Sequence, residues 1–289
     1  MDNKKHSGKV WVVDEDNSED GFTLIAGLDR PEAVCFDINH EFLYVCDTGY
    51  GKDGHIYQYE VDYDDNGDPD KFELRKKTYA IVYKGTPANS CSVDEYGNLF
   101  FSTVNDMIHI VSYLDLWSGF TNQHTTLYDG SNGKISGIQG IDVRESDDIF
   151  YVNSKNTNTI GILNKADAKA SHLNSGDIDV RVMSNEGAHG VACSDDFCFF
   201  ITDNQVFAYD VDDDSLRLKT TGMKQARGIT WGDDYLYVAD HKTNEIYKIE
   251  ADKDSEEWME RWVMIPGAFG VYAINSAGLV AVMMLLTMW

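Results

Sequence analysis

Residues 62–73 have the residue types and the spacing of a calcium-binding loop. The segment reads DYDDNGDPDKFE, and it places Gly67 where such a loop turns sharply. Oxygen-bearing residues stand at the calcium-binding positions of the loop, which here are Asp62, Asp64, Asn66, Asp68, Asp70 and Glu73. Asp68 would contribute its backbone carbonyl and Asp70 a water-bridged contact, while Glu73 would chelate with both carboxylate oxygens. The sequence therefore predicts a structural calcium site.

The segments on either side of this loop favour a second interpretation. IYQYEV before it and LRKKTYAIVY after it have the apolar alternation of β-strands, so the loop lacks the flanking helices of a calcium-binding hand. An acidic hairpin that binds no metal would have the same composition. Both interpretations place residues 62–73 between two strands.

A second set of chemically active residues is spread along the chain at intervals of 57, 50, 50, 38 and 42 residues. A carboxylate, amide oxygens and an imidazole can ligate a divalent cation, and a guanidinium can hold a carboxylate or a developing oxyanion. Such a cation would polarise a carbonyl group or activate a bound water. The set consists of Glu32, Asn89, Gln139, His189, Arg227 and Phe269.

Each of these residues stands just before the first strand of the same repeated element. The element is a small-residue turn followed by two alternating strands, as in PEAVCFDINHEFLYVCDTG and ARGITWGDDYLYVAD. A second repeated element is a short strand that ends in an acidic residue, of which DMIHIVSYLD is one of six copies. Repeats of about 40–50 residues with four strands are typical of propeller blades. We therefore predict an all-β fold, a six-bladed β-propeller with four antiparallel strands per blade and a single domain over residues 1–289.

The C-terminal run GAFGVYAINSAGLVAVMMLLTMW carries no charge over 23 residues and is long enough to cross a bilayer. Part of it, FGVYAINSAGLVAVMM, nevertheless aligns position for position with HGVACSDDFCFFITDN, a copy of the two-strand element. We therefore expect the last blade to be closed by N-terminal outer strands and C-terminal inner strands, from about residues 8–28 and 266–289. A membrane span is the alternative.

Charge and cysteine content narrow the possible partners and compartments. The formal net charge of −25 repels phosphate backbones and anionic lipids, so we expect neither nucleic acid nor a membrane as partner. The start, MDNKKHSGKV, lacks the apolar core of a signal peptide, which predicts a soluble protein that is cytoplasmic, or secreted if a leader has been removed. The five cysteines lie mostly in apolar runs and are expected to be reduced, although a Cys193–Cys198 bond between neighbouring strands is possible.

Residues 31–103 contain the two-strand unit twice, and the first copy ends in the pattern Y-x-x-D. This segment resembles six-bladed propellers of the gluconolactonase, senescence-marker-protein and strictosidine-synthase-like group, whose pattern NHL-type and YWTD-type propellers share. In the lactonase-like members a divalent metal on the ring axis is held by Glu, Asn and Asp. The resemblance implies Glu32 and Asn89 as metal ligands, whereas the axial Asp has no counterpart among the six spaced residues.

The resemblance implies a metal-dependent hydrolase that acts on a small lactone or ester at the central channel. Glu32 would be metal ligand or base, with His189 and Arg227 as further catalytic residues, and the divalent metal would be calcium. Gln139 and Phe269 would line the channel and contact substrate. The alternative is a non-catalytic propeller, stabilised by calcium, that binds a protein or glycan partner. Glu32 and Arg227 would then form an ion pair in the channel, and a metal-free lyase is a third hypothesis.

Overall fold

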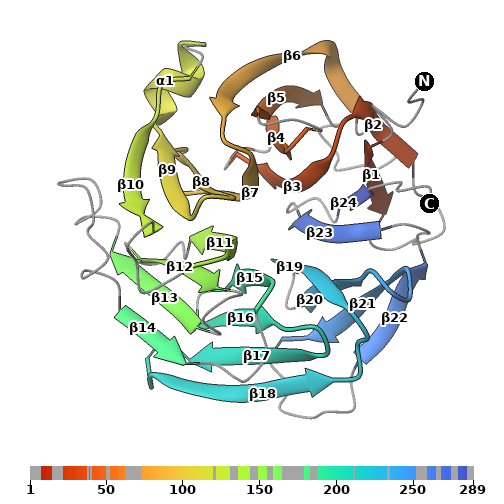
Figure 1. Ribbon diagram of the computed structural model, residues 1–289. Coiled ribbons are helices and arrows are strands. Elements are labelled where there is room, and N and C mark those ends of the chain that lie inside the picture. The colour runs from red at the N-terminus through yellow and green to blue at the C-terminus, as the bar shows by residue number, and fades with distance from the viewer. Residues whose placement is uncertain are drawn as a thin grey trace.

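The described strands are arranged in six four-stranded antiparallel sheets around a centre (Figure 1). The computed structural model describes residues 8–14, 22–37, 39, 41–49, 53–62, 73–119, 122–130, 136–143, 149–154, 159–164, 179–182, 188–194, 196–210, 212–232, 235–251, 259–264, 268–274 and 279–284.

The sheets follow one another in chain order, and each of the first five is built from four consecutive strands. Sheet 1 comprises β3 (Pro31–Phe36), β4 (Phe42–Asp47), β5 (Gly54–Asp62) and β6 (Glu73–Gly85). Sheet 2 comprises β7 (Ala88–Val93), β8 (Leu99–Thr103), β9 (Met107–Val111) and β10 (Thr125–Asp129). Sheet 3 comprises β11 (Ile138–Val143), β12 (Ile149–Ser154), β13 (Thr159–Asn164) and β14 (Asp179–Val182).

Sheets 4 and 5 continue the same pattern on the other side of the ring. Sheet 4 comprises β15 (Gly190–Cys193), β16 (Phe197–Ile201), β17 (Gln205–Asp210) and β18 (Ser215–Thr221). Sheet 5 comprises β19 (Ala226–Gly232), β20 (Tyr235–Asp240), β21 (Glu245–Glu250) and β22 (Met259–Met264).

The closing sheet joins the two ends of the chain. It has the order β2 (Phe22–Leu28), β1 (Gly8–Asp14), β24 (Leu279–Met284), β23 (Ala268–Ile274). The register of β1 on β24 runs from Lys9 opposite Met284 to Asp14 opposite Leu279, which confirms the predicted pairing of the KVWVVD segment with the C-terminal run. In the described part of the chain, no helix is long and apolar enough to cross a membrane.

The innermost strands contact one another all the way round the centre. Each of β3, β7, β11, β15 and β19 contacts the next, β19 contacts β23, and β23 contacts β3 again (Figure 1). The residues at the starts of these strands therefore lie around a common axis, as the repeat spacing predicts. The all-β propeller fold is confirmed.

In sheets 1 and 5 the second strand is buried on both faces and ends in a buried acid. In β4 and β20 every residue after the first is buried, which matches their continuous apolar sequences. Asp47 at the end of β4 accepts hydrogen bonds from the backbone N–H groups of Asp29 and Arg30, at 2.9 and 2.6 Å. These bonds hold the segment that leads into β3, and thereby fix where the innermost strand begins.

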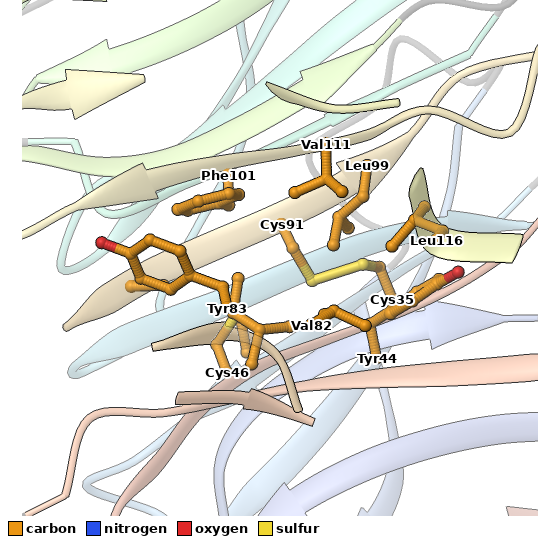
Figure 2. Close-up of a cluster of buried hydrophobic side chains, with 13 residues drawn as sticks. Cys35, Tyr44, Cys46, Val82, Tyr83, Cys91, Leu99, Phe101, Val111 and Leu116 are labelled. Atoms are coloured by element: carbon orange, nitrogen blue, oxygen red, sulfur yellow. A yellow bond between two sulfur atoms is a disulfide. The ribbon is translucent and has the colours of Figure 1, made fainter. Parts of the chain in front are cut away.

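Two disulfides form, contrary to the prediction of reduced thiols, and one of them joins sheets 1 and 2 while the other lies within sheet 4. Cys35 on β3 is bonded to Cys91 on β7, and Cys193 is bonded to Cys198 between β15 and β16. Cys46 is a free, buried thiol whose pKa is raised by burial. Figure 2 shows the Cys35–Cys91 bond inside the core cluster that sheets 1 and 2 share. The prediction failed because two residues 56 positions apart face each other only after the sheets have packed.

A short helix, α1 (Tyr113–Trp117), follows β9 and corrects the prediction that DMIHIVSYLD is a single strand. Ser112 caps its first turn, because its side-chain oxygen accepts a hydrogen bond from the Asp115 N–H group. Leu116 anchors the helix in the core cluster beside Cys35 and Tyr44 (Figure 2). The other apolar side chains of the helix, Tyr113, Leu114 and Trp117, are exposed.

Candidate functional site

Glu32 lies at the start of β3 and pairs with its neighbour in sequence, Arg30. The Arg30 Nε atom is 2.7 Å from the Glu32 carboxylate oxygen Oε1. Burial raises the pKa of the Glu32 carboxyl, and the positive charge of Arg30 opposes that rise. The predicted Glu32–Arg227 ion pair is wrong, since each of the two residues is bonded to a different partner.

His189 and Arg227 are brought together by a single carboxylate, that of Asp203. The His189 Nε2 atom lies 2.9 Å from Asp203 Oδ1, and Arg227 Nη1 donates to the same oxygen. Arg227 also donates to the carbonyl of Ala226, at 3.0 Å. Burial tends to raise the pKa of Asp203, but the hydrogen bonds and charges of Arg227 and His189 outweigh it and lower this pKa. The cluster ties sheet 4 to sheet 5.

Asn89 and Gln139 also share one partner, the carbonyl of Ile138 at the start of β11. The side-chain amide of Asn89 donates to this oxygen at 2.7 Å, and that of Gln139 donates to it at 3.4 Å. The Asn89 bond crosses from sheet 2 to sheet 3. The two amides therefore position the first residue of an innermost strand, which is a structural use of both side chains.

The side chains in this region do not fit the divalent metal that the resemblance implies. Glu32 is engaged by a guanidinium, and the amide of Asn89 is engaged as a donor by a backbone carbonyl. Among the described residues, no three His, Cys, Asp or Glu side chains are grouped so that they could hold a metal ion. We therefore derive no metal-dependent step, and the predicted axial metal stays a prediction.

The remaining predicted residues are only partly described. Phe269 lies on β23, and its side chain is outside the described residues. In the predicted calcium loop, Asp62 and Glu73 face each other at the end of the β5–β6 ladder, and Asp62 lies 3.5 Å from Arg75. This pairing agrees with the hairpin context. Four other predicted calcium ligands lie outside the described residues, namely Asp64, Asn66, Asp68 and Asp70.

A pocket of about 280 Å³ lies between sheet 1 and α1. It is at the far end of β3 from Glu32, since its lining includes the β3–β4 turn, and the two ends of this strand are about 16 Å apart. Two carboxylates, Asp37 and Glu41, belong to the lining. The other residues that matter here are Phe42, Tyr44, Gln58, Tyr113, Leu116 and Trp117.

The helix wall of this pocket is held in place by sheet 2. The Tyr113 N–H group donates to the Asn98 side-chain oxygen at 3.0 Å. The Tyr113 ring lies against Gly97, where a Cβ atom would come within 2.8 Å of it. Gly97 also has a φ of +79°, which favours glycine. None of these residues was predicted as part of a site, although the apolar Tyr113, Leu114 and Trp117 at the end of a predicted strand were a usable signal.

Comparison with known proteins establishes the fold and no more. No protein-family model and no curated protein matches the sequence. A chain in the crystal structure of a nidogen/laminin complex is similar in structure, with a TM-score of 0.67 and 12% identity over 92% of this chain and 95% of that chain. An auxiliary nutrient binding protein from Bacteroides thetaiotaomicron gives a TM-score of 0.60 and 11% identity over 96% of this chain and 76% of that chain.

The WD40 repeats of RRP9 are also similar, with a TM-score of 0.56 and 12% identity over 86% of this chain and 66% of that chain. At such identities the similarity is one of architecture. The chain is a β-propeller. Membership of the gluconolactonase-like group stays a prediction.

Proposed function

We propose that this chain is a non-catalytic propeller that binds a protein partner, with its six sheets acting as the blades of one closed domain. The observation that carries the proposal is the exposed apolar surface of α1, where Tyr113, Leu114 and Trp117 are 43%, 73% and 67% exposed. Tyr and Trp are enriched in the cores of protein interfaces. Because Leu116 anchors the helix, this exposure belongs to a fixed surface beside a pocket.

Three further observations support a binding role. The side chains predicted to be catalytic are engaged within the protein, Glu32 with Arg30, and His189 and Arg227 with Asp203. One structural neighbour was solved in a complex with another protein, as the nidogen/laminin structure records. The two disulfides support a partner that is met in an oxidising compartment, because such bonds are rare in the cytosol.

The competing hypothesis is the metal-dependent hydrolase centred on Glu32 and Asn89. The purified chain should be assayed against a panel of lactones and esters with added calcium, and its bound metal should be measured beside that of the Glu32→Gln variant. We expect no turnover and the same metal content in both proteins. Hydrolysis that is lost both with a chelator and in Glu32→Gln would overturn the proposal.

The binding role is tested with a photo-crosslinking residue at position 114, and with the same residue at Leu218 as the matched control. Leu218 is also exposed but lies on β18, far from α1 in the ring (Figure 1). We expect the chain with the crosslinking residue at position 114 to form a covalent adduct with one defined protein in an extract of the cells that make this chain. Excess unlabelled wild-type chain should compete this capture, and the Trp117→Ala variant should not. Equal competition by both proteins would contradict a role for α1.

A further inference from the structure

Sheets 1 and 5 have the same residue register around the second strand. In sheet 1, Tyr44 on β4 lies opposite Gln58 on β5. In sheet 5, Tyr237 on β20 lies opposite Lys248 on β21. The first residues of the two second strands, Phe42 and Tyr235, are both aromatic. The two sheets therefore present the same pair of aromatic positions on their second strands.

In sheet 5 a basic side chain from this chain lies over these aromatic rings. The Lys248 ammonium group is 4.0 Å from the ring centre of Tyr235 and 5.5 Å from that of Tyr237. Sheet 4 has a related contact from its fourth strand, where the Arg217 guanidinium on β18 lies 4.9 Å from the ring of Phe197, the first residue of β16. A cation over an aromatic face is attracted by the ring quadrupole, so both sheets use the same interaction.

Sheet 1 has the corresponding aromatic rings, those of Phe42 and Tyr44, but its third strand carries no basic residue opposite Tyr44. Gln58 occupies the position of Lys248, and its amide donates to the Tyr44 hydroxyl at 3.2 Å. Phe42, Tyr44 and Gln58 line the 280 Å³ pocket, which α1 extends with Tyr113 and Trp117. The pocket thus combines four aromatic residues with a neutral residue at the position where sheet 5 carries its lysine.

Two carboxylates make this pocket favourable for positive charge. Asp37 and Glu41, from the β3–β4 turn, belong to its lining together with the aromatic residues. Asp37 also accepts a hydrogen bond from the Phe42 N–H group at 2.7 Å, which fixes its carboxylate beside the start of β4. The whole chain has a net charge of −25, which steers basic segments toward its surface.

We propose that the pocket between sheet 1 and α1 binds a basic side chain, lysine or arginine, from a protein partner. This inference rests on the proposed function, because it assigns the chemistry by which the partner is recognised. The partner's cation takes the place that Lys248 takes in sheet 5. Aromatic surroundings of this kind are a known means of binding ammonium groups.

The experiment uses the full chain labelled with 5-fluorotryptophan, whose Trp117 fluorine signal is assigned with the Trp117→Phe variant. The probes are capped tripeptides with lysine, arginine or norleucine between two glycines. Norleucine has the stem of lysine without its charge, so it separates cation binding from burial of an apolar chain. We expect the lysine and arginine probes to shift the Trp117 signal saturably, and the norleucine probe to leave it unchanged.

Three variants locate the effect. Gln58→Lys supplies the pocket with an internal cation, so the affinity for the lysine probe should fall at least about tenfold. Glu41→Gln removes one negative charge without a change of shape, and it should lower the affinity for the lysine probe about threefold. Gln205→Lys makes the same charge change on β17 of sheet 4 and should have no effect on the probe. Thermal unfolding of each variant verifies that it is folded.

Several outcomes would overturn the inference. An equal shift with norleucine means that the pocket is an apolar site. A shift with neutral oligosaccharides but not with basic probes means that it is a glycan site. Equal weakening by Gln58→Lys and Gln205→Lys means that the probes respond only to net charge. If the basic probes bind as expected but crosslinking at position 114 captures no partner, the pocket chemistry stands while the proposed function fails.

Discussion

Sheets 1 and 5 share the same backbone hydrogen bonds at the end of the second strand, but different side chains lie over the aromatic rings of that strand. Both end the second strand in a buried aspartate that holds the segment leading into the innermost strand. Asp240 does so in sheet 5, where it accepts from the backbone N–H groups of Lys224 and Gln225 at 2.6 and 3.0 Å. Asp47 makes the corresponding bonds in sheet 1. Because these bonds involve only the aspartate and the backbone, the side chains beside the aromatic rings can differ between the two sheets.

The two sheets differ in the residues on either side of the inner tyrosine, which is Tyr44 in sheet 1 and Tyr237 in sheet 5. Opposite the inner tyrosine, sheet 1 has Gln58 on its third strand, whereas sheet 5 has Lys248. On the first strand, the residue opposite Tyr44 is the disulfide-bonded Cys35, whereas the residue opposite Tyr237 is Thr230. Sheet 1 is therefore covalently tied to its neighbour and has an open pocket, while sheet 5 covers its own rings.

The largest effect is expected from removing the disulfide that distinguishes sheet 1. The Cys35→Ala/Cys91→Ala double variant loses a cross-link over a sequence separation of 56 residues. Closing a loop of that length in the unfolded chain corresponds to about 4 kcal/mol of unfolding free energy. Urea unfolding without reductant, followed by circular dichroism, measures the loss.

The second disulfide provides the matched control for this prediction. Cys193 and Cys198 are separated by 5 residues, so the Cys193→Ala/Cys198→Ala variant should lose only about 2 kcal/mol. Equal losses in the two variants would show that loop length does not decide the contribution. No loss in the Cys35–Cys91 variant would show that sheets 1 and 2 do not depend on their covalent link.

The fold was predictable because it repeats. A four-stranded unit that recurs along the chain specifies a ring, and the match between the two chain ends specifies how the ring closes. The short helix α1 was not predicted, because Ile110 and Val111 continue the strand pattern up to Ser112, and only the cap at Ser112 starts a new element.

The site was less predictable, because side-chain partners depend on packing between sheets. The spacing correctly grouped His189 with Arg227, but it missed Asp203, which joins them. Asp203 lies one residue beyond the position of the acid in the Y-x-x-D pattern, because Phe199 is the counterpart of Tyr44 in the strand register, so the pattern indicated only the neighbourhood of this residue. Cys35 and Cys91 offered no such signal, since their contact arises only where β3 meets β7.

Stability should depend on pH through sheet 2, where a histidine occupies the third-strand position that Gln58 has in sheet 1. His109 lies opposite Phe101, as Gln58 lies opposite Tyr44. Burial, and secondarily the charge of His124, lower the pKa of His109 to about 4. An unfolded histidine has a pKa of about 6.5, so between these values only the unfolded chain binds the proton. Stability should therefore fall as the pH drops through this window, by up to about 1.4 kcal/mol per pH unit.

The His109→Gln variant isolates this contribution, because it gives sheet 2 the residue of sheet 1. Urea unfolding at several pH values between 7 and 4 should show a shallower loss of stability in the variant than in the wild type. Carboxylates contribute to both slopes equally and cancel in the comparison. Parallel pH profiles would contradict the buried, neutral histidine.

The smallest effect is expected from exchanging the third-strand residues of sheets 1 and 5. Lys248→Gln removes the cation over Tyr235 and Tyr237 and should cost about 0.5–1 kcal/mol of unfolding free energy. Lys248→Arg keeps the charge and should cost less, which separates the cation from the particular side chain. Both are measured by urea unfolding.

The exchange is completed by adding Gln58→Lys to Lys248→Gln. If the two aromatic pairs are equivalent, the new lysine should regain in sheet 1 about what was lost in sheet 5, since distant sites contribute additively. The double variant would then have nearly the stability of the wild type. A double variant less stable than Lys248→Gln alone would mean that the sheet 1 pocket does not accept a cation. The rings of Phe42 and Tyr44 would then have gained nothing from a lysine at position 58, although it occupies the register position of Lys248.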